Sequence, residues 1–368
     1  MVYVLSKSKK KIKGVIVFNV DEADFFRRKL IEKIYRSEIK DLKKKYFFLM
    51  HWSWALRNER DIPHIDYHLA SESGRFKNRK KNKIVNFCNR NFIDKIFKEK
   101  KLTKIYDIIS VIRPVHFKNL KHLFKAASQI YKKKIYPNFL VIFTIDSDKE
   151  FYNSPEFFYT DLIKDYNHYI KKEHRKHFTL LPISTFDHQY QLQKEQICNF
   201  LNLSKFFILP SHEEGANRSI HEALICGCPV IYYKYVIGGA SDYLNNNNSV
   251  SYSSESEISE KIIYAFKNYK KFKLNKKKIK QLISEKYQVP KFRKFLNEIA
   301  KKDKVKIDKS IDLSELDRKL DSHKINLPKN LRLQNTNHIK SFSSFYKYIY
   351  ILLDKKPPIT KKNKFAIF

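Results

Sequence analysis

The stretch from residue 206 to 231, FFILPSHEEGANRSIHEALICGCPVI, constrains the fold more than any other part of the chain. A short apolar run ends in a Pro-Ser turn, a polar loop follows, and a helix is expected from about Asn217. A Gly-Cys-Pro break then leads into a second apolar run. This order of strand, loop, helix and strand is the unit of a parallel α/β sheet, which binds ligands at the carboxyl ends of its strands.

Two carboxylates in this stretch are eight positions apart. Glu214 precedes the expected helix and Glu222 lies inside it, two helical turns further on. We therefore expect Glu214 at the mouth of a site and Glu222 deeper along the same helix face. Charged pairs at this spacing also occur on solvated helix faces, so the spacing alone does not identify a site.

The whole string resembles the donor-binding signature of the GT4-like (group 1) retaining glycosyltransferases of the GT-B fold. That signature has Pro-Ser, two residues, Glu-Gly, a second Glu eight positions after the first, Ala, and a Gly-x-Pro-Val break before a strand. The matching residues are Pro210, Ser211, Glu214, Gly215, Glu222, Ala223, Gly227, Pro229 and Val230. The resemblance implies an α/β fold of two Rossmann-like domains with parallel sheets, of which the N-terminal one is reduced.

The resemblance covers roughly residues 105–300, and a length of 368 residues suits two domains. We expect a reduced acceptor-side domain over 1–104 and a nucleotide-sugar-binding domain over 105–300. Residues 301–368 form a basic tail, for which packing against the N-terminal domain is one option. Apolar runs and helical periodicity predict these elements: strands at 15–20, 46–50, 64–71, 107–112, 139–145 and 178–183, and helices at 23–45, 54–60, 190–203 and 258–269, besides the helix that follows residue 112.

A second anchor of the resemblance lies at the end of the strand at 107–112. Arg113 precedes Lys118 by five positions, and the family carries an Arg and a Lys at this spacing that grip the donor's diphosphate. A leaving nucleoside diphosphate gains negative charge as the glycosidic bond breaks, so fixed cations stabilise the transition state. Pairs of basic residues are common in so basic a chain, and this match has weight only together with the signature.

The resemblance also assigns the remaining donor contacts. It implies that Glu222 hydrogen-bonds the ribose hydroxyls and that Glu214 contacts the transferred sugar. The helix start, whose positive end suits a phosphate, is formed by Gly215, Ala216, Asn217, Arg218 and Ser219. Arg218 adds a phosphate contact or is a surface arginine. The fold alone places the nucleobase on the backbone around Ile183.

On the acceptor side, the strand YFFLMHW resembles the family's strand that ends in an active-site histidine. His51 is therefore the candidate for contact with the sugar or the acceptor. A structural histidine with satisfied hydrogen bonds is the alternative. The short N-terminal domain has no Gly-rich loop, which leaves a reduced or inactive transferase open.

Asp146-Ser147-Asp148 suggests a different chemistry. A strand followed by Asp-x-Asp marks the other glycosyltransferase fold, which binds a divalent metal between carboxylates and diphosphate. Acidic residues after a strand are also ordinary turn residues. Because the glutamate string and Arg113/Lys118 already set the register, we expect a metal-independent enzyme with no cofactor.

The charge of the chain suggests further partners. The formal net charge is +37, which favours anionic lipids, acidic polymers and nucleic acid. A polyanion- or nucleic-acid-binding protein and an inactive GT-B scaffold are the alternative functions, although no nucleic-acid module is evident. With no secretory signal and no run of about 18 apolar residues, we expect a cytoplasmic protein at or near the inner membrane face. Its substrates would be a nucleoside diphosphate sugar and a glycan or lipid-linked acceptor, as in surface polysaccharide or lipopolysaccharide synthesis.

Overall fold

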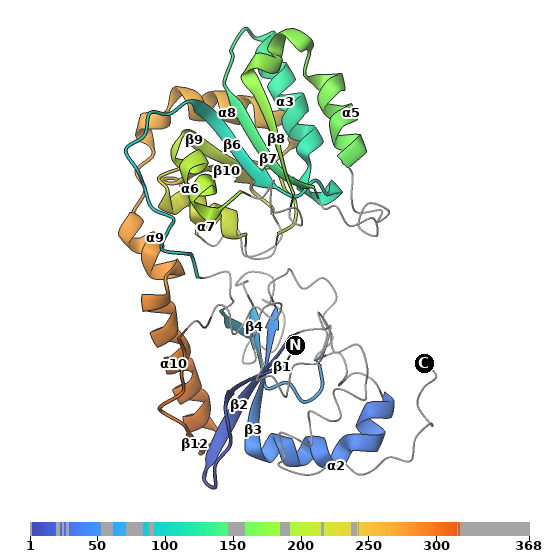
Figure 1. Cartoon of the computed structure of the whole chain (residues 1–368), viewed down its shortest axis with the longest axis vertical. Coiled ribbons are helices and arrows are strands. Elements are labelled where there is room, and N and C mark those ends of the chain that lie inside the picture. The colour runs from blue at the N-terminus through green and yellow to red at the C-terminus, as the bar shows by residue number, and fades with distance from the viewer. Residues whose placement is uncertain are drawn as a thin grey trace.

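The structure is a computed structural model of the chain, and each of its two lobes is built around one β-sheet (Figure 1). The residues that it describes are 2–19, 23, 26, 29–52, 62–70, 84–87, 92–145, 159–184, 192–214, 217–236, 241, 243–314 and 316. The parallel strands of each sheet run toward the other lobe, so the carboxyl ends of both sheets face the middle of the molecule (Figure 1). This arrangement confirms the predicted architecture of two α/β domains with parallel sheets.

The N-terminal lobe has a sheet in which five strands follow one another in chain order. These are β1 (Val2–Ser6), β2 (Ile12–Asn19), β3 (Tyr46–Trp52), β4 (Tyr67–Ala70) and β5 (Ile84–Asn86). Only β1 among them is antiparallel, and the helix α2 (Lys29–Lys45) connects β2 to β3. The runs VIVF and FFLM in β2 and β3 are apolar without alternation because both faces of this sheet are covered.

Residues far along the chain complete this lobe. The helix α10 (Glu285–Lys302) runs along it, and β12 (Lys306–Ile307) pairs in parallel with β2 (Figure 1). Phe292, Leu296 and Ile299 of α10 belong to the same buried cluster as Phe47 and Phe87. The predicted boundaries at residues 104 and 300 therefore stay a proposal, and the packing of α10 favours assigning residues 285–316 to the N-terminal lobe.

The C-terminal lobe holds a fully parallel sheet in the order β11-β10-β9-β6-β7-β8. Its strands are β6 (Tyr106–Ile112), β7 (Phe139–Ile145), β8 (Phe178–Ser184), β9 (Ser204–Leu209), β10 (Val230–Tyr233) and β11 (Ser249–Tyr252). Chain order runs outward from β6 in one direction and from β9 in the other. The sheet thus reverses its direction of winding between β6 and β9, where doubly wound sheets bind their ligands.

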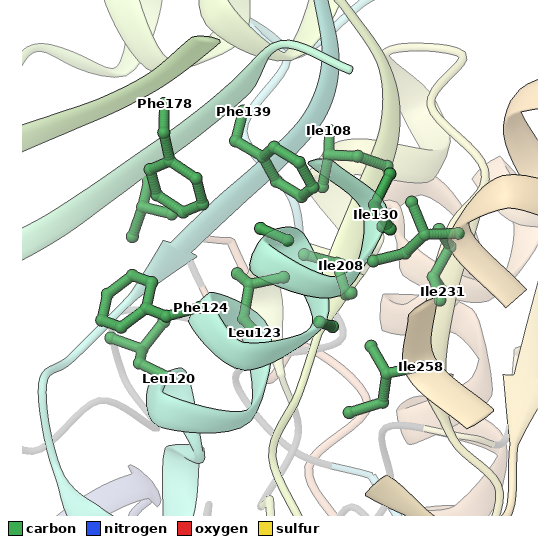
Figure 2. Close-up of a cluster of buried hydrophobic side chains, with 14 of the residues drawn as sticks. Ile108, Leu120, Leu123, Phe124, Ile130, Phe139, Phe178, Ile208, Ile231 and Ile258 are labelled. Atoms are coloured by element: carbon green, nitrogen blue, oxygen red, sulfur yellow. The ribbon is translucent and has the colours of Figure 1, made fainter. Parts of the chain in front are cut away.

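Helices cover both faces of this sheet. On one face lie α3 (Leu120–Lys132), α5 (Tyr159–Tyr169) and α8 (Ile258–Lys267), and their core includes Phe124, Phe139 and Ile258 (Figure 2). On the other face lie α6 (Lys194–Asn202), α7 (Arg218–Ile225) and α9 (Lys276–Ile283). The 3-10 helices among the described residues of this lobe are η4 (His116–Lys118), η5 (Lys172–His177), η7 (Glu255–Glu257) and η8 (Tyr269–Lys271).

The boundaries of several predicted elements differ from the structure. The helix α2 is described over Lys29–Lys45, and Ala23, where the predicted helix begins, is also helical. The helix α6 begins at Lys194 rather than at residue 190, and Gln196 accepts from the backbone N–H of Gln193 at 2.7 Å. The helix predicted over 54–60 lies outside the described residues. The sequence did not predict the short strands β1, β5, β11 and β12, nor the helices α5, α9 and α10, whose segments are rich in lysine or aromatic residues without a clean period.

Candidate functional site

The loops after β6 and β9 meet at the point where the sheet reverses. His212 donates its backbone N–H to the carbonyl of Phe117 at 3.2 Å, and the Asn119 amide donates to the carbonyl of Pro210 at 3.2 Å. Asn119 has a φ of 53°, a left-handed conformation that asparagine tolerates better than most residues. Two loops about 95 residues apart in sequence are thereby fixed side by side.

Lys118 and Glu214 form a buried ion pair between these loops. The Lys118 ammonium contacts Oε1 of Glu214, and their side chains are only 10% and 6% exposed. Burial lowers the pKa of Lys118, the Glu214 carboxylate opposes this effect, and the nearby positive charge of Arg113 adds to it. The structure thus brings together three of the predicted residues, with Arg113 exposed at the end of β6.

The signature helix α7 is capped at both ends by its own sequence. The Asn217 side chain accepts from the backbone N–H of Ile220 at 3.1 Å. At the other end Gly227 has a φ of 78°, and the N–H groups of Gly227 and Cys228 return to Leu224 and Ala223 as in a Schellman motif. The Gly-x-Pro break of the signature therefore ends the helix and aims the chain into β10.

Two carboxylates and one imidazole are buried on or next to this helix. Glu222 is 9% exposed and Glu214 5% exposed, so both predicted carboxylates lie inside the protein rather than on a solvated face. His221, which the sequence did not single out, is 1% exposed and packs edge-on against Tyr243 with ring centroids 4.4 Å apart. Its position directly before Glu222, the second glutamate of the signature, was the sequence signal that could have identified it.

Ahead of α7 and in its first turn lie buried polar atoms without a hydrogen-bond partner among the residues that the structure describes. Among them are the Ser211 hydroxyl and Nε of Arg218. Ser211 is 0% exposed, and a buried polar group without a partner is costly. The Arg218 charge also lowers the pKa of Asp94, after the larger contribution of the Lys194 hydrogen bond. Neither atom is thus satisfied by the described part of the chain.

The other predicted residues lie in different surroundings. His51 is 4% exposed at the carboxyl end of β3, in the N-terminal lobe. Ile183 lies near the carboxyl end of β8 and packs against the core of the C-terminal lobe, while Ser219 is half-buried in the first turn of α7. Gly215 and Ala216 lie outside the described residues, as do Asp146 and Asp148.

A small polar hollow lies beside the loop of His212, between α3 and η7. Its volume is about 310 Å³, and its lining includes His122, Lys125 and Glu255. His122 Nε2 lies 3.3 Å from Glu255, and the His122 and His212 rings are 6.0 Å apart. Burial lowers the pKa of both histidines, so a neutral imidazole is favoured at each.

In the part of the chain that the structure describes, no group of three or more His, Cys, Asp or Glu side chains is arranged to hold a metal ion. Among the described helices, none combines the length and the apolar character needed to cross a bilayer. The described cysteines (Cys198, Cys226 and Cys228) are buried free thiols.

The model of one protein family, described as glycosyl transferases group 1, matches residues 91–288, more than half of the chain. The chain belongs to the group 1 glycosyl transferase family. The match extends from before β6 to the start of α10, and it includes Arg113, Lys118 and the whole signature. The predicted family is thereby confirmed. No curated protein matches the chain.

Solved structures with a similar fold share little sequence with this group 1 protein. A glycosyltransferase from Rickettsia africae ESF-5 is 15% identical over 77% of this chain and 81% of that chain, with a TM-score of 0.51. The lipopolysaccharide outer core galactosyltransferase WaaB is 18% identical over 72% of this chain and 70% of that chain, with a TM-score of 0.50. TarM is 18% identical over 69% of this chain, with a TM-score of 0.48, and this chain spans 50% of its length.

Proposed function

We propose that the chain transfers a sugar from a nucleoside diphosphate sugar to a glycan or lipid-linked acceptor, with retention of configuration and without a metal ion. The observation that carries this proposal is the buried Lys118–Glu214 pair at the reversal of the sheet. Burying an ion pair costs desolvation free energy and stabilises a fold little. A pair in this place is better explained by a ligand than by stability.

The residues around the pair supply what a departing diphosphate requires. Arg113 and Lys118 provide fixed positive charge, and the amino end of α7, with the unpartnered Ser211 hydroxyl and Arg218 Nε, provides donors. In addition to its sugar contact, Glu214 would hold the ammonium of Lys118 in place. Glu222 would accept hydrogen bonds from the ribose hydroxyls.

In the proposed reaction the bond from the anomeric carbon to the phosphate oxygen breaks as an acceptor oxygen attacks from the same face. The bonding electrons stay with the diphosphate, whose oxygen takes the proton of the acceptor hydroxyl. Cations and helix dipoles placed before the reaction stabilise the charge that develops. His51, at the carboxyl end of β3, is the candidate for the acceptor side.

The acceptor class is proposed from charge and from the likeness in fold to WaaB, a lipopolysaccharide galactosyltransferase. We expect an acceptor used in surface polysaccharide or lipopolysaccharide synthesis, and a protein that works at the cytoplasmic face of a membrane. Two segments rich in lysine and aromatic residues, 76–83 and 342–356, are candidates for membrane contact and lie outside the described residues.

The test is a thermal-shift panel of UDP-, GDP- and ADP-sugars with and without EDTA. At about a hundredfold excess over its dissociation constant, a donor should add roughly 2.7 kcal/mol of stability. Lys118→Ala should abolish the shift. Lys121→Ala should preserve it, because the Lys121 side chain is 56% exposed and its ammonium lies 3.4 Å from Asp165. A panel in which no donor shifts the melting temperature rejects the proposal, and a shift that needs manganese rejects the metal-free mechanism.

A further inference from the structure

The amino ends of β6, β7 and β8 form a basic and aromatic edge on the C-terminal lobe, remote from the candidate donor site. Four segments make up this edge: 101–105, 132–138, 171–177 and 264–271. They contain twelve Lys or Arg residues and one acidic residue, Glu173, whereas the whole chain has 75 basic and 38 acidic residues. The excess of positive charge here is therefore well above the bias of the composition.

Large apolar side chains are exposed on the same edge. Among the described residues, seven large hydrophobic side chains are exposed, and five of them lie in these segments. They are Leu102 at 39%, Ile105 at 51%, Tyr136 at 45%, Tyr264 at 50% and Phe266 at 37%. Single exposed apolar residues are ordinary, but a group of them surrounded by lysine marks an interaction surface.

Contacts between the segments show that they form one surface. Tyr136 stacks on His177 with ring centroids 5.3 Å apart, and His177 Nδ1 lies 3.0 Å from the Asn138 amide oxygen. The Asn138 amide nitrogen donates to the carbonyl of Ile105 at 3.3 Å.

The surface continues from there to α8. Asp107 accepts from the backbone N–H of Asn138 and pairs with Lys205 at 2.7 Å. The Lys205 ammonium lies 5.1 Å from the centre of the Phe266 ring. These contacts link η5 through β6 and β9 to α8, at the end of the lobe that faces away from the N-terminal lobe (Figure 1).

We propose that this basic-aromatic edge binds the surface of an anionic phospholipid membrane. Lysine side chains near such a surface are attracted by its anionic headgroups, and each of them strengthens binding. Tyrosine and lysine suit the interface because each joins an apolar body to a polar tip. Leu102, Ile105 and Phe266 add apolar surface that enters the headgroup region.

The composition of the edge favours a membrane over nucleic acid. Its cations are lysines apart from Arg175, and lysine lacks the planar fork with which arginine grips phosphates and bases. Exposed Leu102 and Ile105 gain nothing from a phosphate backbone but gain from lipid. Docking through this edge leaves the opposite, ligand-binding edge of the sheet open. The membrane surface and the donor site can therefore be tested separately.

Vesicle flotation tests whether the lysines of this edge are needed for membrane binding. Lys132→Glu with Lys133→Glu and Lys134→Glu should weaken binding to phosphatidylglycerol-containing vesicles about 100-fold at low salt. The matched control is Lys7→Glu with Lys10→Glu and Lys11→Glu, three exposed lysines of the N-terminal lobe, which should bind within about threefold of the unchanged protein. Equal loss in both variants, or equal binding to pure phosphatidylcholine, would overturn the proposal.

A second set of variants tests the exposed aromatic side chains. The double variant Tyr136→Ser, Phe266→Ser should weaken vesicle binding roughly tenfold. The control variant Tyr235→Ser, Tyr287→Ser should bind as the unchanged protein does, because these two tyrosines are 58% and 38% exposed but lie outside the edge. A donor-induced thermal shift in every variant checks that the protein is folded. Binding of the unchanged protein to heparin or duplex DNA but not to vesicles would identify a polyanion site and reject the membrane.

Discussion

The two lobes of this protein obtain similar parallel sheets in different ways. The C-terminal sheet is formed by strands that follow one another between residues 106 and 252, and each half is wound in chain order. The N-terminal sheet is complete only when β12 pairs with β2, which lies almost 300 residues earlier in the chain. Its core also needs α10, which packs on the sheet. One lobe is thus continuous in sequence, and the other depends on long-range packing.

The lobes also differ in what they bury. The C-terminal lobe buries Lys118, Glu214, Glu222 and His221 at the carboxyl edge of its sheet. The described core of the N-terminal lobe is mainly aliphatic and aromatic, with rings such as Phe18, Phe26 and Phe48 in edge and stacked contacts. Buried charges cost stability, whereas buried rings contribute to it. The lobe that holds the candidate donor site should therefore respond differently to substitution from the N-terminal lobe.

The largest effect is expected in the N-terminal lobe, for Phe292→Ala. Phe292 is 0% exposed and stacks on Phe87 with ring centroids 4.7 Å apart, so its loss should cost about 4 kcal/mol of the free energy of unfolding. Urea unfolding should show that only the transition of the N-terminal lobe shifts to lower urea concentration. The affinity of the variant for nucleotide should be unchanged. Tyr287→Ala on the same helix, 38% exposed, should change stability by less than about 0.5 kcal/mol. Loss of donor binding in Phe292→Ala would contradict the independence of the lobes.

Breaking the buried pair should cost somewhat less. Lys118→Ala leaves Glu214 without its ammonium and should lower the free energy of unfolding by about 3 kcal/mol. Lys118→Met with Glu214→Leu removes both charges and should recover most of that stability. Lys194→Ala, which breaks the exposed pair with Asp94, serves as the control and should cost less than about 1 kcal/mol. A Lys118→Ala protein as stable as the control would show that the pair is not buried in solution.

Within the site, the two glutamates should separate binding from turnover. Glu214→Ala should lower kcat about 30-fold, or about 2 kcal/mol, because its contacts strengthen as charge develops on the sugar and the phosphate. Glu222→Ala should mainly raise KM, because a ribose contact persists through the reaction. Steady-state kinetics with varied donor decide this. Equal changes of kcat and KM in both variants would remove the division of roles.

The smallest effect concerns pH and the histidine pair beside the site. Burial holds the pKa of His122 below its usual value of about 6.5. Between that value and the lower pKa of the folded protein, the unfolded chain binds more protons, so stability falls as pH falls. Glu255, whose pKa is lowered chiefly by the Lys125 hydrogen bond, adds its own loss at more acidic pH. His122→Gln should reduce the loss between pH 7 and 5 by less than about 1 kcal/mol, as thermal melts at several pH values would show, and an unchanged or steeper slope would contradict it.

The sequence predicted much of the C-terminal lobe because its strands and its signature helix are marked by short, contiguous sequence patterns. Apolar runs such as FLVIFTI predicted β7 residue for residue, and the Pro-Ser to Pro-Val string located α7 and its ends. The same string identified Glu214 and Glu222, whose burial follows from their place beside β9.

Long-range features were not predictable in this way. The helix α10 has Pro290 inside it and many lysines, and its apolar face becomes evident only against the N-terminal sheet. The hydrogen bond from Asn119 to Pro210 and the ion pair of Lys118 with Glu214 join residues more than 90 positions apart. The family resemblance indicated Arg113 and Lys118 as a pair, but only the structure shows that Lys118 contacts Glu214.

The central claim is that Arg113, Lys118 and the α7 start bind a nucleoside diphosphate in the C-terminal lobe. Calorimetric titration of UDP, GDP and ADP into the unchanged protein and into the Lys118→Met, Glu214→Leu variant tests it most directly, in EDTA and at the same ionic strength. The account predicts that at least one nucleotide binds the unchanged protein without metal and that the variant, folded and stable, loses at least about 30-fold in affinity. Equal affinity in both proteins, or no binding to the unchanged protein, would contradict the account.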